Sequence, residues 1–269
     1  MGATVIANAF IDKLRGFATL SVADVALLEA ACADYRDYPA RHDIIREDDA
    51  PGQPLVMLSG WACHYKTLPE GTRQITALLI PGDCCGLHAT ILDKIDHTIA
   101  TLTQARVASL PRQRLDEILD TSPALMKALW WAQLVGEGTL RAWIVSMGRR
   151  SSVERVAHLM CELWIRARNI GLTQGNRFEL PLTQFVLADA LGLTPVHVNR
   201  VLRKLRLAGI MELGAGTLVI ADVAQLARVA GFDDNYLHRR VSNLAKPVCT
   251  GDDQVNLGKH RCSEPAWPD

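Results

Sequence analysis

The stretch Leu180–Leu213, LPLTQFVLADALGLTPVHVNRVLRKLRLAGIMEL, decides the fold. Its apolar spacing predicts two short helices joined by a turn at Gly192, followed by an apolar, glycine-punctuated hairpin. Thr183 and Thr194 stand where the N-caps of the two helices would lie. Pro195 takes the first position of the second helix, where no amide hydrogen is needed. The pattern is typical of a helix-turn-helix with a wing.

The second helix has two unlike faces. At 100° per residue, its apolar side predicts the contact with the core and consists of Val198, Val201, Leu202 and Leu205. The opposite side carries the residues that we expect to read base edges in a DNA major groove, namely Val196, Asn199, Arg200 and Arg203. An arginine can donate to guanine O6 and N7, an asparagine can pair with adenine, and a valine can pack on a thymine methyl group.

Other residues of this stretch suit different contacts. Four of them suit the phosphate backbone: Thr183, Gln184, Thr194 and His197. The hairpin tip, Gly214–Gly216, can approach the minor groove. Phe185 and Val186 fall where the first helix would be exposed, and we expect them to pack under the neighbouring helix rather than to contact a partner protein. Any two amphipathic helices joined by glycine share this outline, but the division of faces, the caps and the wing favour DNA binding.

Length and composition set the frame around this stretch. The chain has 269 residues, of which 49% are hydrophobic and 22% charged, as in a soluble globular protein of one large or two ordinary domains. No apolar run approaches the roughly 18 residues of a membrane span, and no secretion signal is recognisable. The seven cysteines are odd in number and include no CxxC pair, so we expect reduced thiols in the cytoplasm rather than disulfides or a zinc site.

Charge is unevenly distributed on a chain whose net charge is zero. Residues 149–213 contain ten basic and five acidic residues. A locally basic region on a neutral chain suits a polyanionic partner that binds one part only. An ordinary solvated helix surface remains the alternative.

The region before this stretch shows two different sequence patterns, one typical of helices and one typical of strands. Residues 4–34 show helical spacing, with an N-cap at Ser21. Between residues 38 and 112, turn signals at Pro51-Gly52, Ser59-Gly60, Glu70-Gly71 and Pro81-Gly82 separate short apolar runs, which predicts a small antiparallel barrel or sandwich. The runs ITALLI and TIATL are predicted strands.

A long helix is predicted from Ser122 to Gly148. A 4-3-4-3-4 spacing connects Leu125, Leu129, Ala132, Gly136, Thr139 and Trp143. Such a seam favours dimerisation through a coiled coil, and the alternative is packing on the barrel of the same chain. Gly148 is the predicted hinge, Ser152 the predicted cap of a further helix ending at Gly171, and Asp222 the cap of a short helix after the wing.

Taken together, these motifs resemble the bacterial Crp/Fnr transcription regulators over roughly residues 5–240. The residues that carry the resemblance are LSGWACHYKTLPEGTRQITALLIPGDCCGL, DHTIATL and LADALGLTPVHVNRVLRKLRLAGI. The resemblance implies an α+β fold with a double-stranded, cyclic-nucleotide-binding-like β-roll, a long dimerisation helix and a C-terminal winged helix-turn-helix. The expected boundaries are 1–120 for the roll, 121–148 for the helix and hinge, 149–240 for the DNA-binding domain and 241–269 for a disordered tail.

The resemblance also implies a function. Members of the family bind two-fold symmetric sites on double-stranded DNA as homodimers and recruit or obstruct RNA polymerase. Arg200 matches the arginine of the family's recognition helix, and Asn199 the position before it. Val196 stands where the best-known members hold a glutamate, so their half-site sequences do not transfer to this chain.

The first half departs from the cyclic-AMP-binding pattern. Gly86 is followed by Leu87 instead of glutamate, and His97-Thr98 replaces an arginine-bearing pair. We expect weak or no cyclic-AMP binding, because the cyclic phosphate loses its guanidinium partner. No iron–sulfur cluster is expected either, because no cysteine cluster lies near the N-terminus. The effector remains open.

Candidates for a thiol switch or metal site in the sensor half are Cys63, Cys84, Cys85, His88 and His97. The alternative is that they are buried small hydrophobes and incidental histidines. A rival to the whole DNA-binding hypothesis is a small-molecule-binding signalling module whose winged domain contacts proteins. An enzyme is not expected, and no catalytic residue is assigned, because the chain contains no glycine-rich phosphate loop, nucleophile elbow or HExxH motif.

Overall fold

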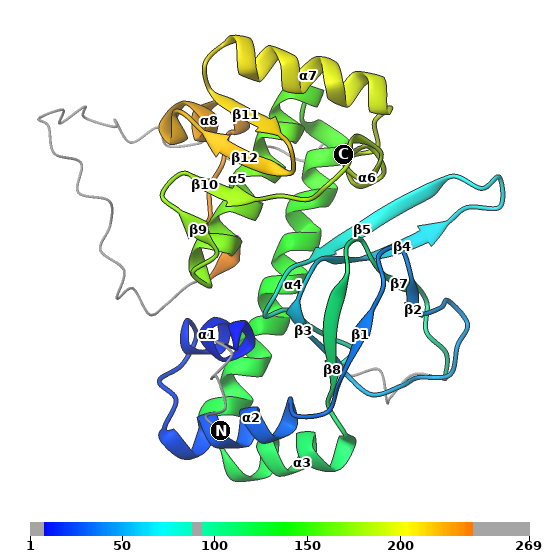
Figure 1. The fold of residues 1–269 in the computed structure, drawn as a ribbon, viewed down its shortest axis with the longest axis vertical. Helices are drawn as coiled ribbons and strands as arrows, with labels where there is room; N and C mark the ends of the chain where they lie inside the picture. Colours follow the sequence, from blue (N-terminus) through cyan, green and yellow to red (C-terminus); the bar gives the residue numbers. More distant parts are fainter. Residues whose placement is uncertain (1–7, 88–92, 239–269) are drawn as a thin grey trace, which may run out of the picture.

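The computed structural model describes residues 8–87 and 93–238, and its elements follow the predicted α+β order (Figure 1). Two short helices come first, α1 (Ala9–Arg15) and α2 (Val22–Ala31). Gly16 is the C-cap of the first helix and separates it from the second. The Ser21 hydroxyl accepts from the Asp24 amide in a capping box, which confirms the predicted N-cap.

A β-roll of two antiparallel four-stranded sheets follows. Its strands are β1 (Tyr35–Tyr38), β2 (Asp43–Ile45), β3 (Leu55–Ser59), β4 (Ala62–Thr67), β5 (Arg73–Leu79), β6 (Cys84–Cys85), β7 (Thr98–Thr101) and β8 (Ala105–Ser109). One sheet has the order β1-β8-β3-β6 and the other β2-β7-β4-β5. Gly60, at φ +79°, makes the turn between β3 and β4, where a Cβ atom would collide with the Gln104 carbonyl. Alternate residues of both sheets fill the interior with Leu55, Met57, Ala62, Leu79, Ile99, Ala105 and Val107.

The long helix α4 (Pro123–Arg149) runs between the two halves after a short α3 (Arg112–Thr121) (Figure 1). Gly148 lies inside α4, so the predicted hinge was wrong by two residues. The bend falls at Arg150 and Ser151, whose backbones are extended. Helix α5 (Ser152–Asn169) is capped by Ser151 rather than Ser152, because Ser151 stands three residues before Glu154 and forms a capping box with it.

The predicted seam of α4 faces its own chain. Leu125 and Leu129 are buried beneath α1 and α3, and Trp143 is buried against α5. Gly136, another residue of that seam, is exposed. The alternative, packing on the barrel of the same chain, therefore holds only in part. Leu125 and Leu129 share a cluster with Val56 and Ala108 of the roll, whereas Trp143 packs on α5.

The winged domain completes the chain. It consists of α6 (Gln184–Leu191), α7 (Pro195–Leu207), α8 (Val223–Ala230), the turn η2 (Asn235–Leu237) and a sheet of order β11-β12-β10-β9. Those strands are β9 (Thr173–Gln174), β10 (Arg177–Glu179), β11 (Met211–Gly214) and β12 (Thr217–Ile220). Asp222 caps α8 as predicted. The residues of the expected tail, 241–269, lie outside the described ranges.

One apolar cluster joins the roll to the winged domain. Cys63, Ile75 and Leu78 of the β4–β5 hairpin belong to the same buried cluster as Leu187 and Leu191 of α6. The two halves are thus held together by a dry contact as well as by α4. Within residues 8–87 and 93–238, no helix has both the length and the apolar character that crossing a membrane requires.

Candidate nucleic-acid interface

The helix-turn-helix is built by local capping, as its sequence predicts. The Thr183 hydroxyl accepts from the Val186 amide at 3.2 Å, and the Thr194 hydroxyl from the His197 amide at 3.2 Å. Gly192 ends α6 in the left-handed region, at φ +60°. The N–H groups that each helix leaves without a partner are thereby partly satisfied, and the angle between α6 and α7 is fixed.

The two faces of α7 separate as expected. Val198, Val201 and Leu205 are buried. The four predicted base-reading residues, Val196, Asn199, Arg200 and Arg203, are all exposed, and Val196 is 70% exposed. Neither Arg200 nor Arg203 forms an ion pair with another residue of the described chain. This face therefore offers two unneutralised guanidinium groups and an apolar contact to a partner.

The predicted phosphate contacts divide into two groups. Thr183, Gln184 and Thr194 are exposed, and each threonine hydroxyl that accepts in a cap can still donate outward. His197 is half-buried, and its Nε2 lies 3.0 Å from the Ser152 hydroxyl at the start of α5. That contact ties the recognition helix to α5, a role that its sequence position did not reveal.

Two apolar residues at the start of α6 behave differently. Val186 packs against the core, as expected. Phe185 is 70% exposed, so the expectation that it packs under the neighbouring helix was wrong. Phe185 lies in the first turn of α6, whose buried side is formed by Leu187, Ala188, Ala190 and Leu191. The wing tip at Ala215 and Gly216 has positive φ angles, as a tight hairpin requires.

The sensor cysteines do not meet. Cys63 lies in the cluster between the roll and the winged domain, Cys84 packs beneath the N-terminal helices, and Cys85 packs in the roll interior. Burial raises the pKa of Cys63 and of Cys85 to about 12 and that of Cys84 well above its ordinary value. All three are therefore protonated, poorly nucleophilic thiols at neutral pH.

The histidines of the sensor half form a stacked pair. The rings of His64 and His97 lie 4.4 Å apart, and His97 Nδ1 lies 2.7 Å from an Asp96 carboxylate oxygen. Burial, with His97 beside it, lowers the pKa of His64 to about 4. Across residues 8–87 and 93–238, no group of three or more His, Cys, Asp or Glu side chains could hold a metal ion. The fifth candidate, His88, lies outside the described residues.

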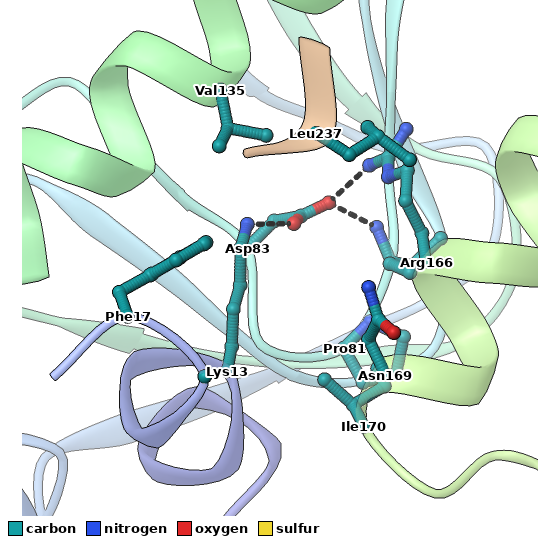
Figure 2. Close-up of a pocket in the computed structure, with 11 residues that line it drawn as sticks. Lys13, Phe17, Pro81, Asp83, Val135, Arg166, Asn169, Ile170 and Leu237 are labelled. Atoms are coloured by element: carbon teal, nitrogen blue, oxygen red, sulfur yellow. Dashed lines mark hydrogen bonds and ion pairs between the residues drawn. The ribbon is translucent and has the colours of Figure 1, made fainter. Parts of the chain in front are cut away.

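A buried ion cluster joins the roll to α5, as Figure 2 shows. The Asp83 carboxylate forms two ion pairs, at 2.5 Å with the Lys13 ammonium group and at 2.7 Å with the Arg166 guanidinium group. Burial alone would raise the pKa of Asp83, but the two cations outweigh it and lower that pKa. Arg166 also reaches Glu162 at 3.2 Å. No local sequence pattern predicts this cluster, because Asp83 and Arg166 are 83 residues apart along the chain.

The cavity beside this cluster is small. It is lined by Phe17, Ile80, Val135, Asn169 and Leu237, among others, and measures about 50 Å³. That volume holds only a few water molecules. The cavity therefore has no room for a ligand of nucleotide size.

Comparison with known proteins agrees with this geometry. Residues 35–122 match the cyclic nucleotide-binding domain, and residues 154–229 match the Crp-like helix-turn-helix domain. Together the two matches cover more than half of the chain. The roll, long helix and winged domain define a bacterial transcription regulator, and the chain belongs to the Crp/Fnr family.

Individual relatives carry regulatory names. The chain is 27% identical over 205 residues to the transcriptional activator protein FnrL of Cereibacter sphaeroides, covering 75% of this chain and 82% of that protein. It is 28% identical over 189 residues to the nitrogen fixation regulation protein FixK of Bradyrhizobium diazoefficiens, covering 70% and 78%. The solved structure of FixK2 from Bradyrhizobium japonicum superposes with a TM-score of 0.64 at 25% identity, covering 72% of this chain and 96% of that one.

Proposed function

We propose that this chain is a homodimeric, sequence-specific DNA-binding regulator that acts in the cytoplasm and whose roll does not respond to cyclic AMP. Its division into a roll, a dimerisation helix that ends at the bend at Arg150 and Ser151, and a DNA-binding domain after that bend is part of the proposal. The observation that carries it is the outer face of α7, where four side chains are exposed. The helix is capped at its N-terminus, and its opposite face is buried in the core. A face of this kind fits a major groove.

The direct test is selection from random duplex DNA, followed by binding measurements on the enriched duplex. Arg200→Ala should weaken binding by about 1–3 kcal/mol and relax the preference at one base pair of each half-site. Arg206→Ala is the matched control. It removes the same charge from the same helix, but from a side chain that lies 3.9 Å from Glu212. The control should leave the base preference unchanged, and equal effects of both substitutions would contradict base reading by Arg200.

The dimer is proposed from the outward side of α4. Large apolar residues are exposed along it, including Met126, Trp130, Leu140, Ile144 and Met147. With Gln133 and Glu137 between them, these residues follow a 4-3-4-3-4-3 spacing. Trp130 is 66% exposed and Ile144 70% exposed. A seam of this kind is satisfied by a second copy of the helix, which would place two α7 helices on a two-fold symmetric site.

Weak or absent cyclic-AMP binding is proposed from the residues at the expected phosphate position. His97 is stacked on His64, and the Thr98 hydroxyl already accepts from the Glu47 amide at 3.1 Å. No guanidinium replaces the missing arginine at the pair His97-Thr98 itself. Titration calorimetry with cyclic AMP should show no binding, and a dissociation constant in the micromolar range or below would refute this part of the proposal.

RNA polymerase remains a proposed partner. FnrL carries the name of a transcriptional activator, and Phe185 exposes an aromatic ring at the start of α6. Exposed aromatic residues are enriched in protein interfaces. Phe185→Ala should therefore leave DNA affinity intact and lower transcription from a promoter that carries the selected site.

A further inference from the structure

The last turn of α6 depends on residues from elsewhere in the chain. A helix leaves its final carbonyl groups without internal partners and carries partial negative charge at that end. Helix α6 has no basic residue in its last turn, and it adds the Asp189 carboxylate there. Three donors from outside the helix supply what is missing, Arg73, Gln74 and Arg155. We call this set, together with Asp189, Ala190 and Leu191, the α6 clamp.

The roll contributes the first part of the clamp. Arg73, at the start of β5, brings Nε to 2.8 Å and a terminal guanidinium nitrogen to 2.6 Å from Oδ2 of Asp189. The guanidinium lies over the Tyr65 ring of β4, 5.3 Å from its centroid, and the Tyr65 hydroxyl donates to Asp43 at 3.0 Å. Arg73 is therefore oriented by the roll before it reaches the winged domain.

The remaining clamp contacts lie one and two residues further along α6. The Gln74 amide lies 3.5 Å from the Ala190 carbonyl. Arg155 donates to the Leu191 carbonyl at 2.7 Å, and its other terminal nitrogen donates to the Met147 and Arg150 carbonyls at 3.0 Å and 3.3 Å. Arg155 thus joins the turn of the helix-turn-helix to the end of α4 and to the bend after it.

These contacts surround the apolar junction of the two halves. Ile75, the residue after Gln74, is fully buried in the same cluster as Leu187 of α6. The Arg73 and Asp189 side chains are 37% and 28% exposed, so water only partly screens the pair. Helix α7 begins at Pro195, four residues after the clamped turn. Rotation of the winged domain about Arg150 and Ser151 must break the pair.

We propose that Arg73 is a positioning residue for DNA binding, which fixes the recognition helix relative to the roll through Asp189. The clamp leaves the reading face of α7 uncovered, so the orientation that it stabilises keeps this face open to a partner. A change in the β4–β5 hairpin then reaches the helix-turn-helix directly, without passing through α4. The inference rests on the proposed DNA-binding function.

Charge reversal tests it on the full-length protein with the duplex enriched by the wild type. Arg73→Asp alone and Asp189→Arg alone should each weaken binding by about tenfold. The double variant, which restores an opposite-charge pair, should return to within about threefold of the wild type. A merely structural role for either residue would give no rescue. Unchanged or increased affinity in the single variants, or a double variant no better than the singles, would overturn the proposal.

A matched control exists inside the roll. Arg106 and Asp37 form a two-bond ion pair at 2.8 and 3.0 Å, and the Arg106 guanidinium also lies over a tyrosine ring, that of Tyr35. Reversing this pair, singly or doubly, should leave DNA affinity unchanged. An effect as large as that at Arg73 would show that any disturbance of the roll weakens binding, and it would overturn the special role of Arg73.

A second measurement does not need DNA. Tryptic cleavage after Arg149 and Arg150, followed by mass spectrometry, reports opening of the bend between α4 and α5. The single reversals at Arg73 and Asp189 should speed this cleavage at least about fivefold, and the double variant should reverse the effect. If the wild type enriches no duplex, the proposed function fails, and the cleavage rates still decide whether the clamp holds the winged domain. Equal cleavage in all variants would refute the clamp.

Discussion

The two halves of this molecule treat their candidate functional residues in opposite ways. In the winged domain, Val196, Asn199, Arg200 and Arg203 are exposed and take no part in the core. In the roll, Cys63 is buried in one apolar cluster, and the partly buried Cys84 and Cys85 pack against two others. The exposed face of α7, which we call the output surface, is free to contact a partner. The candidate sensor cysteines instead pack in the interior and stabilise the fold.

This contrast indicates where the roll can still act on DNA binding. A residue that is both packed and protonated cannot easily sense a solute, but the elements that it supports can move. The β4–β5 hairpin is such an element, because it carries Cys63 on one side of the junction and Arg73 at its start. The difference between the halves therefore favours signalling by hairpin position over chemistry at a cysteine.

Thiol reactivity gives the largest expected effect. With the pKa of Cys63 and of Cys85 raised to about 12 by burial, the thiolate fraction at pH 8 falls on the order of a thousandfold below that of an ordinary thiol. Alkylation by iodoacetamide, followed peptide by peptide, should be slower in the native protein than in urea by about that factor. If either residue of the native protein were labelled at the rate of the unfolded protein, the roll would also expose a reactive residue, and the thiol-switch hypothesis would be restored.

Loss of the dimer comes next. Leu140→Asp combined with Ile144→Asp places two carboxylates in the exposed row of α4, where pairing with a second copy would desolvate them. Sedimentation should show a monomer, and affinity for the selected duplex should fall by more than about a hundredfold, because one half-site is lost. Val22→Asp is the control. It replaces a valine that is 89% exposed at the start of α2, and it should change neither property. A dimeric double variant would place the interface elsewhere.

Val196→Glu sharpens the description of the output surface. A glutamate accepts from the cytosine N4 amino group, whereas a valine packs on a thymine methyl group. Repeated selection should therefore show a shift toward cytosine at one position, with a relative affinity change of about 1–3 kcal/mol. The melting temperature should stay unchanged, since the Val196 side chain makes no core contact. An unaltered preference would mean that Val196 does not face a base.

Local chemistry explains which parts of this fold were predictable. The caps at Ser21, Thr183 and Thr194 depend on residues within three positions, so the sequence displays them directly. The two faces of α7 were equally clear, because one face is apolar and the other polar. For these elements the predicted and observed structures agree closely.

Longer-range features could not be derived in the same way. Helix α4 is apolar on both sides, so its periodicity predicted a seam but not which apolar side is buried within the chain and which stays exposed. Arg73 and Asp189 are 116 residues apart, and nothing local marks them as partners. Phe185 was expected inside because it is apolar, and only the placement of α6 against β5 shows that it points outward.

The last expected effect concerns the packing of α5 against Phe232 and Tyr236, and it depends on pH. His158 of α5 is buried, with its ring stacked 5.9 Å from that of Tyr236 and edge-on to Phe232. Burial, with a smaller effect of Arg150, lowers the pKa of His158 from 6.5 to about 4. Between these two values the unfolded chain binds the proton and the folded chain does not. The free energy of unfolding should therefore decrease as pH falls from about 6.5 to about 4, by up to about 1.4 kcal/mol per pH unit from this group.

His158→Phe keeps an aromatic ring in place and removes this proton, so urea unfolding of the variant should be less sensitive to pH than that of the wild type. The buried Glu162, whose pKa is raised by burial, contributes with the opposite sign but equally to both proteins, so the difference isolates the histidine. Identical pH dependence of the two proteins would show that His158 is hydrated in solution, and that water reaches the contact of α5 with Phe232 and Tyr236.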